Sequence, residues 1–415
     1  MKNSVSAVAP LSLQRRTIVL LSLAQVFSGL GTGAVVSVGS LLAVQLSGST
    51  SWGGSVTTVM TLGAAVASMP LARWALVHGR RNTLSGGLLI AAVGAILMIV
   101  AASLQSFALL LLGAATLGVG SAVNLQARFA ATDLSAPNRR ARDLSLVVWT
   151  TTVGSVAGPN MLGLGERVGA SLGMPEYTGI FVFSTTGLVI ASLIIFLGLR
   201  PDPYFLAKSI AEQSGVAVTQ PQRLGFRQTA IKLRGNKAAQ AGLISILTGH
   251  GIMVSVMSVT SVHLDQHGAA LTIIGLTISL HIAGMYALSP IVGMLADRLG
   301  PRTTTLIGFG ILVAATAAAG FGQGSHTWVT VGLVLLGLGW SAATISGSAQ
   351  IVSAVAPEIR VSVQGVSDTL MSLAGATGGL LAGLGLSGLG FGGLNAAAAS
   401  VAIIGAILVL RLGKR

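Results

Sequence analysis

The chain alternates between long apolar runs and short breaks that hold most of its charged residues, prolines and polar clusters. A helix needs about 20 apolar residues to cross the hydrocarbon core of a bilayer. On that criterion the pattern predicts twelve spanning helices and an all-α integral membrane protein. The predicted spans are about 17–40, 52–76, 83–103, 107–131, 143–165, 178–199, 239–263, 271–295, 303–323, 328–353, 363–385 and 390–411.

One break is much longer than the others and divides the chain into two halves of six helices. The predicted halves are residues 1–199 and 239–415, joined by a linker at 200–238 that is rich in proline and basic residues. Residues of the first half recur about 220 positions later: Leu117, Gly118, Gly120, Ser121 and Ala122 return as Leu336, Gly337, Gly339, Ser341 and Ala342, and Ala136, Pro137 and Arg140 return as Ala356, Pro357 and Arg360. A parallel repeat of this kind is typical of transporters that rock around a site near the middle of the membrane.

Composition and charge agree with a membrane protein. The chain is 52% hydrophobic and only 8% charged, with a mean hydropathy of +0.84, whereas soluble domains are about 25% charged. All of the 24 basic residues except Arg167 fall on one side of the predicted layout, and basic residues are retained on the cytoplasmic side. The sequence therefore predicts a multi-pass protein of a bacterial inner membrane with both termini and the linker in the cytoplasm.

The same observations exclude several functional classes. The net charge of +14 is explained by topology, so no nucleic-acid partner is expected. The absence of cysteine excludes disulfides and thiolate metal sites. No catalytic triad, carboxylate pair or phosphate-binding loop is present, so we expect neither an enzyme nor a cofactor. The expected partners are the lipid bilayer and a small solute, and the chain is expected to function as a monomer.

A short segment of the second half resembles a known loop. The run from Gly293 through Asp297, Arg298 and Gly300 to Arg302 resembles the motif between helices 8 and 9 of the major facilitator superfamily. The resemblance implies the major facilitator fold, with transport by alternating access. It also implies that Asp297, beside Arg298 at a helix end, clamps neighbouring helices in one state and releases them in the other.

The corresponding loop of the first half is less complete. It keeps Gly79, Arg80 and Arg81, but Leu76 stands where the acidic residue is expected. The prediction of a clamp therefore applies to the second half.

Helices 4 and 5 carry further candidate residues. In helix 5, Gly154, Gly158, Pro159, Asn160 and Gly163 resemble the glycine-proline motif of antiporters. The alternative is simple close packing of helices, which small residues allow. In helix 4, Asn124, Gln126 and Arg128 form a polar face that contacts either the substrate or the facing helix.

Histidine and methionine side chains dominate helices 7 and 8. His250, Met253 and Met257 share one face of helix 7, and His281 and Met285 share one face of helix 8. Thioethers and imidazoles together suit Cu(I). The alternative is that the methionines only fill gaps in the core. His263, Asp265 and His267 cluster at the outer turn between the two helices, where they would form a capture point.

The spacing on these helices resembles a particular branch of the family. Met253-x3-Met257 followed by His281-x3-Met285 resembles the paired metal-binding motifs of CcoA-type copper importers. The resemblance implies that these four residues hold copper as the transported substrate. CcoA-type importers also carry functional cysteines, which this chain lacks, and related riboflavin transporters share the motifs. The second expectation is therefore a transporter of riboflavin or a drug, with proton antiport as one form of coupling. In it Trp149, Trp340 and Tyr286 would stack or pack, while the methionines line an adaptable cavity.

Overall fold

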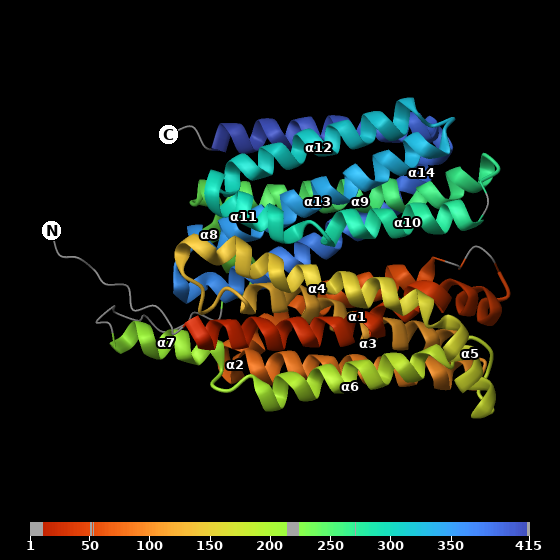
Figure 1. Ribbon diagram of the computed structural model, residues 1–415, viewed down its shortest axis with the longest axis horizontal. Helices are drawn as coiled ribbons and strands as arrows, with labels where there is room; N and C mark the ends of the chain where they lie inside the picture. The colour runs from red at the N-terminus through yellow and green to blue at the C-terminus, as the bar shows by residue number, and fades with distance from the viewer. Residues whose placement is uncertain (1–10, 50–51, 53, 214–223, 270, 413–415) are drawn as a thin grey trace. The chain divides into compact units, whose positions relative to one another are not determined.

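The structure is a computed structural model that describes residues 11–49, 52, 54–213, 224–269 and 271–412 (Figure 1). Within these ranges it contains helices and no strands. The first half comprises α1 (Leu11–Ser47), α2 (Ser55–Ser103), α3 (Phe107–Ala130), the short 3-10 helix η2 (Pro137–Arg139), α4 (Arg140–Asn160), α5 (Leu162–Ser171) and α6 (Ile180–Gly198). The linker contains α7 (Pro203–Gln213) and α8 (Phe226–Arg234). The second half comprises α9 (Lys237–Gln266), α10 (Leu271–Tyr286), α11 (Ser289–Leu299), α12 (Pro301–Phe321), α13 (His326–Ala354) and α14 (Pro357–Leu412).

Two of the longest helices are each a pair of helical arms. α2 is interrupted at Gly79, with φ 77°, and α14 at Gly390, with φ 69°. Residues with a Cβ rarely adopt such positive φ values, so glycine is required at both breaks. The arms correspond to the predicted spans at 52–76, 83–103, 363–385 and 390–411. In the described part of the chain, eight helices are long and apolar enough to cross a membrane. The all-α membrane fold is confirmed, while the number of twelve spans stays a prediction.

The span predicted at 271–295 corresponds to Ile273–Leu299, which is long and apolar enough to cross a membrane, and the structure adds a local break near its middle. α10 ends at Tyr286 and α11 begins at Ser289. Pro290 has no N–H group with which to continue the helical ladder to the Tyr286 carbonyl. That carbonyl instead accepts a hydrogen bond of 2.6 Å from the Ser289 hydroxyl. The span predicted at 143–165 is likewise divided, at Met161, between α4 and α5.

The chain forms two compact units. The first comprises Met1–Thr229 and Ala356–Thr369, and the second comprises Ala230–Val355 and Leu370–Arg415. The beginning of α14 therefore groups with the first unit, although it follows the linker in the sequence.

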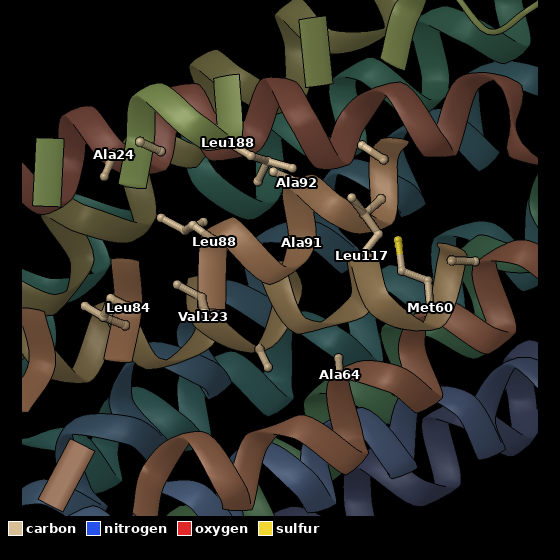
Figure 2. Close-up of a cluster of buried hydrophobic side chains, with 14 of the residues drawn as sticks. Ala24, Met60, Ala64, Leu84, Leu88, Ala91, Ala92, Leu117, Val123 and Leu188 are labelled. Atoms are coloured by element: carbon tan, nitrogen blue, oxygen red, sulfur yellow. The ribbon is translucent and has the colours of Figure 1, made fainter. Parts of the chain in front are cut away.

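Each unit packs its helices through small and branched side chains. In the first unit α1, α2, α3 and α6 share a core, part of which Figure 2 shows: Ala24, Met60, Ala64, Leu84, Leu88, Ala91, Ala92, Leu117, Val123 and Leu188. In the second unit α13 is central and packs against α9, α10 and α12 (Figure 1). Small residues allow the close helix approach on which packing in lipid depends.

Candidate functional site

Three ring-bearing side chains meet midway along the central helices of the second unit. Trp340, at the middle of α13, donates a hydrogen bond of 3.0 Å from its indole N–H to Nδ1 of His250 in α9. Tyr286, at the end of α10, lies edge-on to Trp340, with ring centroids 5.5 Å apart and planes at 84°. Trp340 is buried, whereas His250 and Tyr286 are partly exposed. Trp340 and Tyr286 therefore pack against each other, and the hydrogen bond from Trp340 makes His250 part of the same cluster. The role of these residues in binding a solute stays a prediction.

The helix break between α10 and α11 adjoins this aromatic cluster, because Tyr286 is the last residue before it. Non-helical backbone at membrane depth is tolerated only where it is buried in protein or lines a cavity. Interrupted helices near the middle of the membrane are also a common feature of transporter binding sites. The aromatic cluster and the break together make this the strongest candidate site.

His281 lies one turn before Met285 on α10 and is completely buried. Its Nδ1 is 2.7 Å from the carbonyl oxygen of Leu333 in α13. A carbonyl can only accept, so Nδ1 carries the proton and Nε2 carries the lone pair. Among the described residues, this buried Nε2 has no hydrogen-bond partner. The face of α10 that carries His281 and Met285 approaches α13 closely: a Cβ added at Gly337 would lie 2.5 Å from the His281 carbonyl oxygen.

The two methionines of α9 differ in burial. Met253 is buried and Met257 is partly exposed. Both α9 and α10 pack mainly against α13 and contact each other little. Within the described ranges, no three histidine, aspartate or glutamate side chains gather as a metal site would require. The copper set of Met253, Met257, His281 and Met285 therefore stays a prediction.

The tryptophan of the predicted helix 5 lies in the first unit. Trp149 is in α4, and its side chain is 42% exposed. Its part in binding an organic solute stays a prediction.

The histidines of the predicted outer turn are held by neighbouring groups. His263 donates from Nε2 to the Gln323 carbonyl over 2.9 Å and stacks on Phe391, with ring centroids 3.9 Å apart. His267 donates from Nδ1 to the His263 carbonyl over 2.8 Å. The Asp265 side chain lies outside the described residues. The capture point stays a prediction.

In the first unit, the polar residues of helix 4 contact neighbouring helices. Asn124 accepts a hydrogen bond of 2.7 Å from Ser28 of α1, and Gln126 donates one of 3.0 Å to the Ser68 carbonyl of α2. Arg128 forms an ion pair that is described next. These contacts agree with the helix-facing alternative, and a role in substrate binding stays a prediction.

A buried network of charges joins the beginning of α14 to the rest of the first unit. Arg128 lies 2.7 Å from Asp368, and Arg80 lies 2.8 Å from Asp133. Arg80 also donates a hydrogen bond of 2.7 Å to Gln364. The sequence identifies Asp368 as a carboxylate within an apolar run, but its partner is 240 residues away in the chain. Nothing in the local sequence indicates that pairing.

The first-half loop that contains Gly79, Arg80 and Arg81 obtains a carboxylate from outside its own motif. Leu76 occupies the acidic position, yet Asp202 accepts a hydrogen bond of 2.7 Å from the backbone N–H of Arg81. Asp202 also accepts one of 3.0 Å from the backbone N–H of Tyr204, so it caps α7 at the same time. A Cβ at Gly79 would clash with the Asp202 carboxylate. The position of Asp202 directly before Pro203 indicates its capping role in the sequence. No local pattern in the sequence indicates its contact with Arg81.

The loop of the second half, at Gly300, has a backbone similar to that of the first-half loop at Gly79. Gly300 joins α11 to α12 with φ 87° and ψ 148°, close to the φ 77° and ψ 176° of Gly79 in the first loop. Gly293 is buried, Asp297 is partly exposed and Arg298 is exposed in the last turn of α11. The clamp assigned to Asp297 and Arg298 stays a prediction.

The glycine-proline segment is described only in part. Gly154 lies against α1, where an added Cβ would be 2.5 Å from the Val26 carbonyl oxygen, and Gly163 has open space around it. The side chains of Gly158, Pro159 and Asn160 lie outside the described residues. Close packing is thus shown at Gly154, and the antiporter implication stays a prediction.

Comparison with known proteins places the chain in a family. The Major Facilitator Superfamily model matches residues 21–263 and 241–415. The chain is 37% identical over 374 residues to the uncharacterized MFS-type transporter YddS of Bacillus subtilis, covering 90% of this chain and 85% of that protein. It is 26% identical over 365 residues to the riboflavin transporter RfnT of Brucella anthropi, covering 86% of this chain and 85% of the relative. The fold is similar to that of the human organic anion transporter MFSD10 (TETRAN), with a TM-score of 0.74 at 16% identity, covering 97% of this chain and 100% of the other. The chain therefore belongs to the Major Facilitator Superfamily and, like its relatives, is a transporter and not an enzyme.

Proposed function

We propose that this transporter moves a small organic solute with a flat aromatic ring system, of the flavin type, and that the ring binds beside Trp340 and Tyr286. The observation that carries the proposal is the cluster of His250 and Trp340, near the middle of α9 and α13, with Tyr286 at the end of α10. Sites for organic ligands are lined mainly by apolar and aromatic side chains, with a few placed polar groups. Aromatic rings attract one another in offset-stacked and edge-to-face arrangements. The edge-on pair of Tyr286 and Trp340 therefore offers favourable packing to a further flat ring.

A relative supports the same solute class. RfnT, which is named a riboflavin transporter, matches 86% of this chain. The match covers both units, so the likeness is not confined to a shared loop. This match favours an organic solute over copper as the substrate.

The test is riboflavin uptake by the purified protein in liposomes, together with equilibrium binding followed by flavin fluorescence. We expect Trp340→Phe, which keeps a ring, to retain binding. Trp340→Leu should weaken binding about 2- to 12-fold, because an aromatic pair contributes roughly 0.5–1.5 kcal/mol beyond the burial of its area. The matched control is Trp149→Leu, since that tryptophan is exposed and belongs to the first unit. Failure of the wild-type protein to bind or transport riboflavin would overturn the proposal.

Copper is a second candidate, favoured by one specific observation. The buried Nε2 of His281 has a lone pair and no hydrogen-bond partner among the described residues, and Met285 is buried one turn further along α10. An imidazole nitrogen beside a thioether suits Cu(I). Uptake of Cu(I) by the same liposomes, with no uptake of riboflavin, would favour this candidate.

A further inference from the structure

Three hydroxyl groups on one face of α13 are buried without a partner. Ser341, Thr344 and Ser348 are 0%, 2% and 0% exposed, and within the described part of the chain their hydroxyls have no hydrogen-bond partner. Their spacing of three and four residues places them on one face of the helix. Hydroxyls in helices usually bond to the carbonyl four residues earlier, as those of Thr316 and Thr330 do here. A buried hydroxyl without any bond is costly, so three in a row require an explanation.

The row begins level with the break between α10 and α11. α10 runs parallel to α13, because Thr277 bonds to Thr330 and His281 bonds to Leu333, at separations of 53 and 52 residues. The same offset places Ser341 beside residue 288, in the break itself. The row therefore begins where the neighbouring helix is discontinuous, and irregular backbone at this depth is a feature of transporter binding sites.

Other faces of α13 pack against α9 and α12. Ser346 bonds to Thr305 of α12 over 2.8 Å and also to the Ala342 carbonyl. Gly347 lies against α9, because a Cβ added at this position would be 2.7 Å from the Gly242 carbonyl oxygen. The Ser346 hydroxyl, which faces α12, is thus paired. By the offset given above, Thr344 and Ser348 lie level with α11, which also packs against α13, yet among the described residues their hydroxyls and that of Ser341 have no partner. These unpaired groups are the observation that points to a ligand.

We infer that Ser341, Thr344 and Ser348 form a hydrogen-bonding row for a polyhydroxylated tail on the transported ring compound. This inference rests on the proposed function and adds the second half of the substrate. Each hydroxyl both donates and accepts, which matches the hydroxyls of a polyol. The row spans seven residues, or about 10 Å of helix. Trp340 lies one turn before Thr344, so these two side chains lie on the same side of α13. A ring held at Trp340 could therefore extend a tail of several carbons along the row.

The chemistry of the row disfavours other ligands. Residues 337–348 contain no charged side chain, so the row offers no counter-charge to an anion. Neutral hydroxyls are also poor ligands for Cu(I), which prefers sulfur and nitrogen.

The experiment compares two probes on the same purified protein. Riboflavin carries a ribityl tail, and lumiflavin has the same ring system with a methyl group in its place. We expect Ser341→Ala, Thr344→Val and Ser348→Ala each to weaken riboflavin binding about 2- to 12-fold, which corresponds to the usual net value of one hydrogen bond. Lumiflavin binding should change less than about twofold, because lumiflavin has no tail to bind.

A matched control and a stability readout separate ligand binding from folding. Ser346→Ala removes a hydroxyl of the same helix and the same burial that already has partners. It should lower the melting temperature and leave the ratio of riboflavin to lumiflavin affinity unchanged. The three row variants should melt, without ligand, at or above the wild-type temperature, because no hydrogen bond is lost.

The outcomes distinguish this inference from the proposed function. Equal effects of the row variants on both probes, or no effect on either, would overturn the polyol row while the flavin function stands. Tighter binding of riboflavin than of lumiflavin by the wild type, lost in the variants, would support it. Absence of binding of either flavin would overturn the proposed function, and this inference with it.

Discussion

The guanidinium of Arg128 lies 2.7 Å from the carboxylate of Asp368, and both side chains are almost completely buried. The pair ties the beginning of α14 to α3 within the first unit, across 240 residues of sequence. Removing two charges from water is expensive, and the attraction between them offsets that cost only while both are present.

The loss of one partner should therefore be worse than the loss of both. We expect Arg128→Met to lower the free energy of unfolding by about 3–5 kcal/mol, because it leaves Asp368 buried and uncompensated. The double variant Arg128→Met with Asp368→Leu should regain most of that loss. Thermal melting in detergent of both single variants and the double variant measures the difference. A double variant less stable than either single variant would show that the pair is net stabilising and contradict this expectation.

Gly337 should tolerate no side chain. An added Cβ would lie 2.5 Å from the His281 carbonyl oxygen and 2.7 Å from the Met285 backbone nitrogen. We expect Gly337→Ala to cost about 1–3 kcal/mol of stability and to reduce transport, because overpacking would push α10 away from α13. Gly310→Ala in α12 is the control, since open space surrounds that position. Equal melting temperatures for the two variants would argue against the close contact.

The copper candidate makes its own prediction. Met257→Leu and Met285→Leu keep size and hydrophobicity but delete the sulfur, so a packing role should survive both changes. If copper is the substrate, Cu(I) uptake should collapse in both variants and in His281→Phe, with protein levels unchanged. Normal Cu(I) uptake by the two leucine variants would remove these sulfurs from the ligand set. Riboflavin uptake measured in the same vesicles indicates whether the variants still cycle.

The membrane orientation can be tested without background, because the chain has no cysteine. Ser209 lies in α7 of the linker, and Ser325 precedes α13. We expect Ser325→Cys to react with a membrane-impermeant thiol reagent in intact cells, and Ser209→Cys to react only after the cells are opened. Labelling of Ser209→Cys in intact cells would reverse the predicted topology.

The sequence predicts the helices well and their partners poorly. Apolar periodicity and the basic residues locate the breaks near Gly79 and Gly300, because each break is a local property of a few residues. Pro290 was a local signal for the division of helix 8, but the long apolar run around it favoured a continuous span. His250 and Trp340 are 90 residues apart in the sequence, and no local pattern indicates a contact between residues at such a separation. The sequence therefore predicts which helices, 7, 8 and 10, carry the residues of the candidate site. It does not predict how those side chains contact one another.

The contact between Asp202 and Arg81 has a consequence for dividing the protein. Asp202 lies three residues beyond the end of the first six-helix half as the sequence predicts it, 1–199. A fragment ending there would retain the Arg81 N–H but lose the carboxylate that accepts its hydrogen bond. If the two halves were produced as separate polypeptides, the cut would have to fall after Asp202 to keep this hydrogen bond. The first residues of the linker thus belong structurally to the loop at Gly79 and Arg81, and they cannot be exchanged freely for an arbitrary tether.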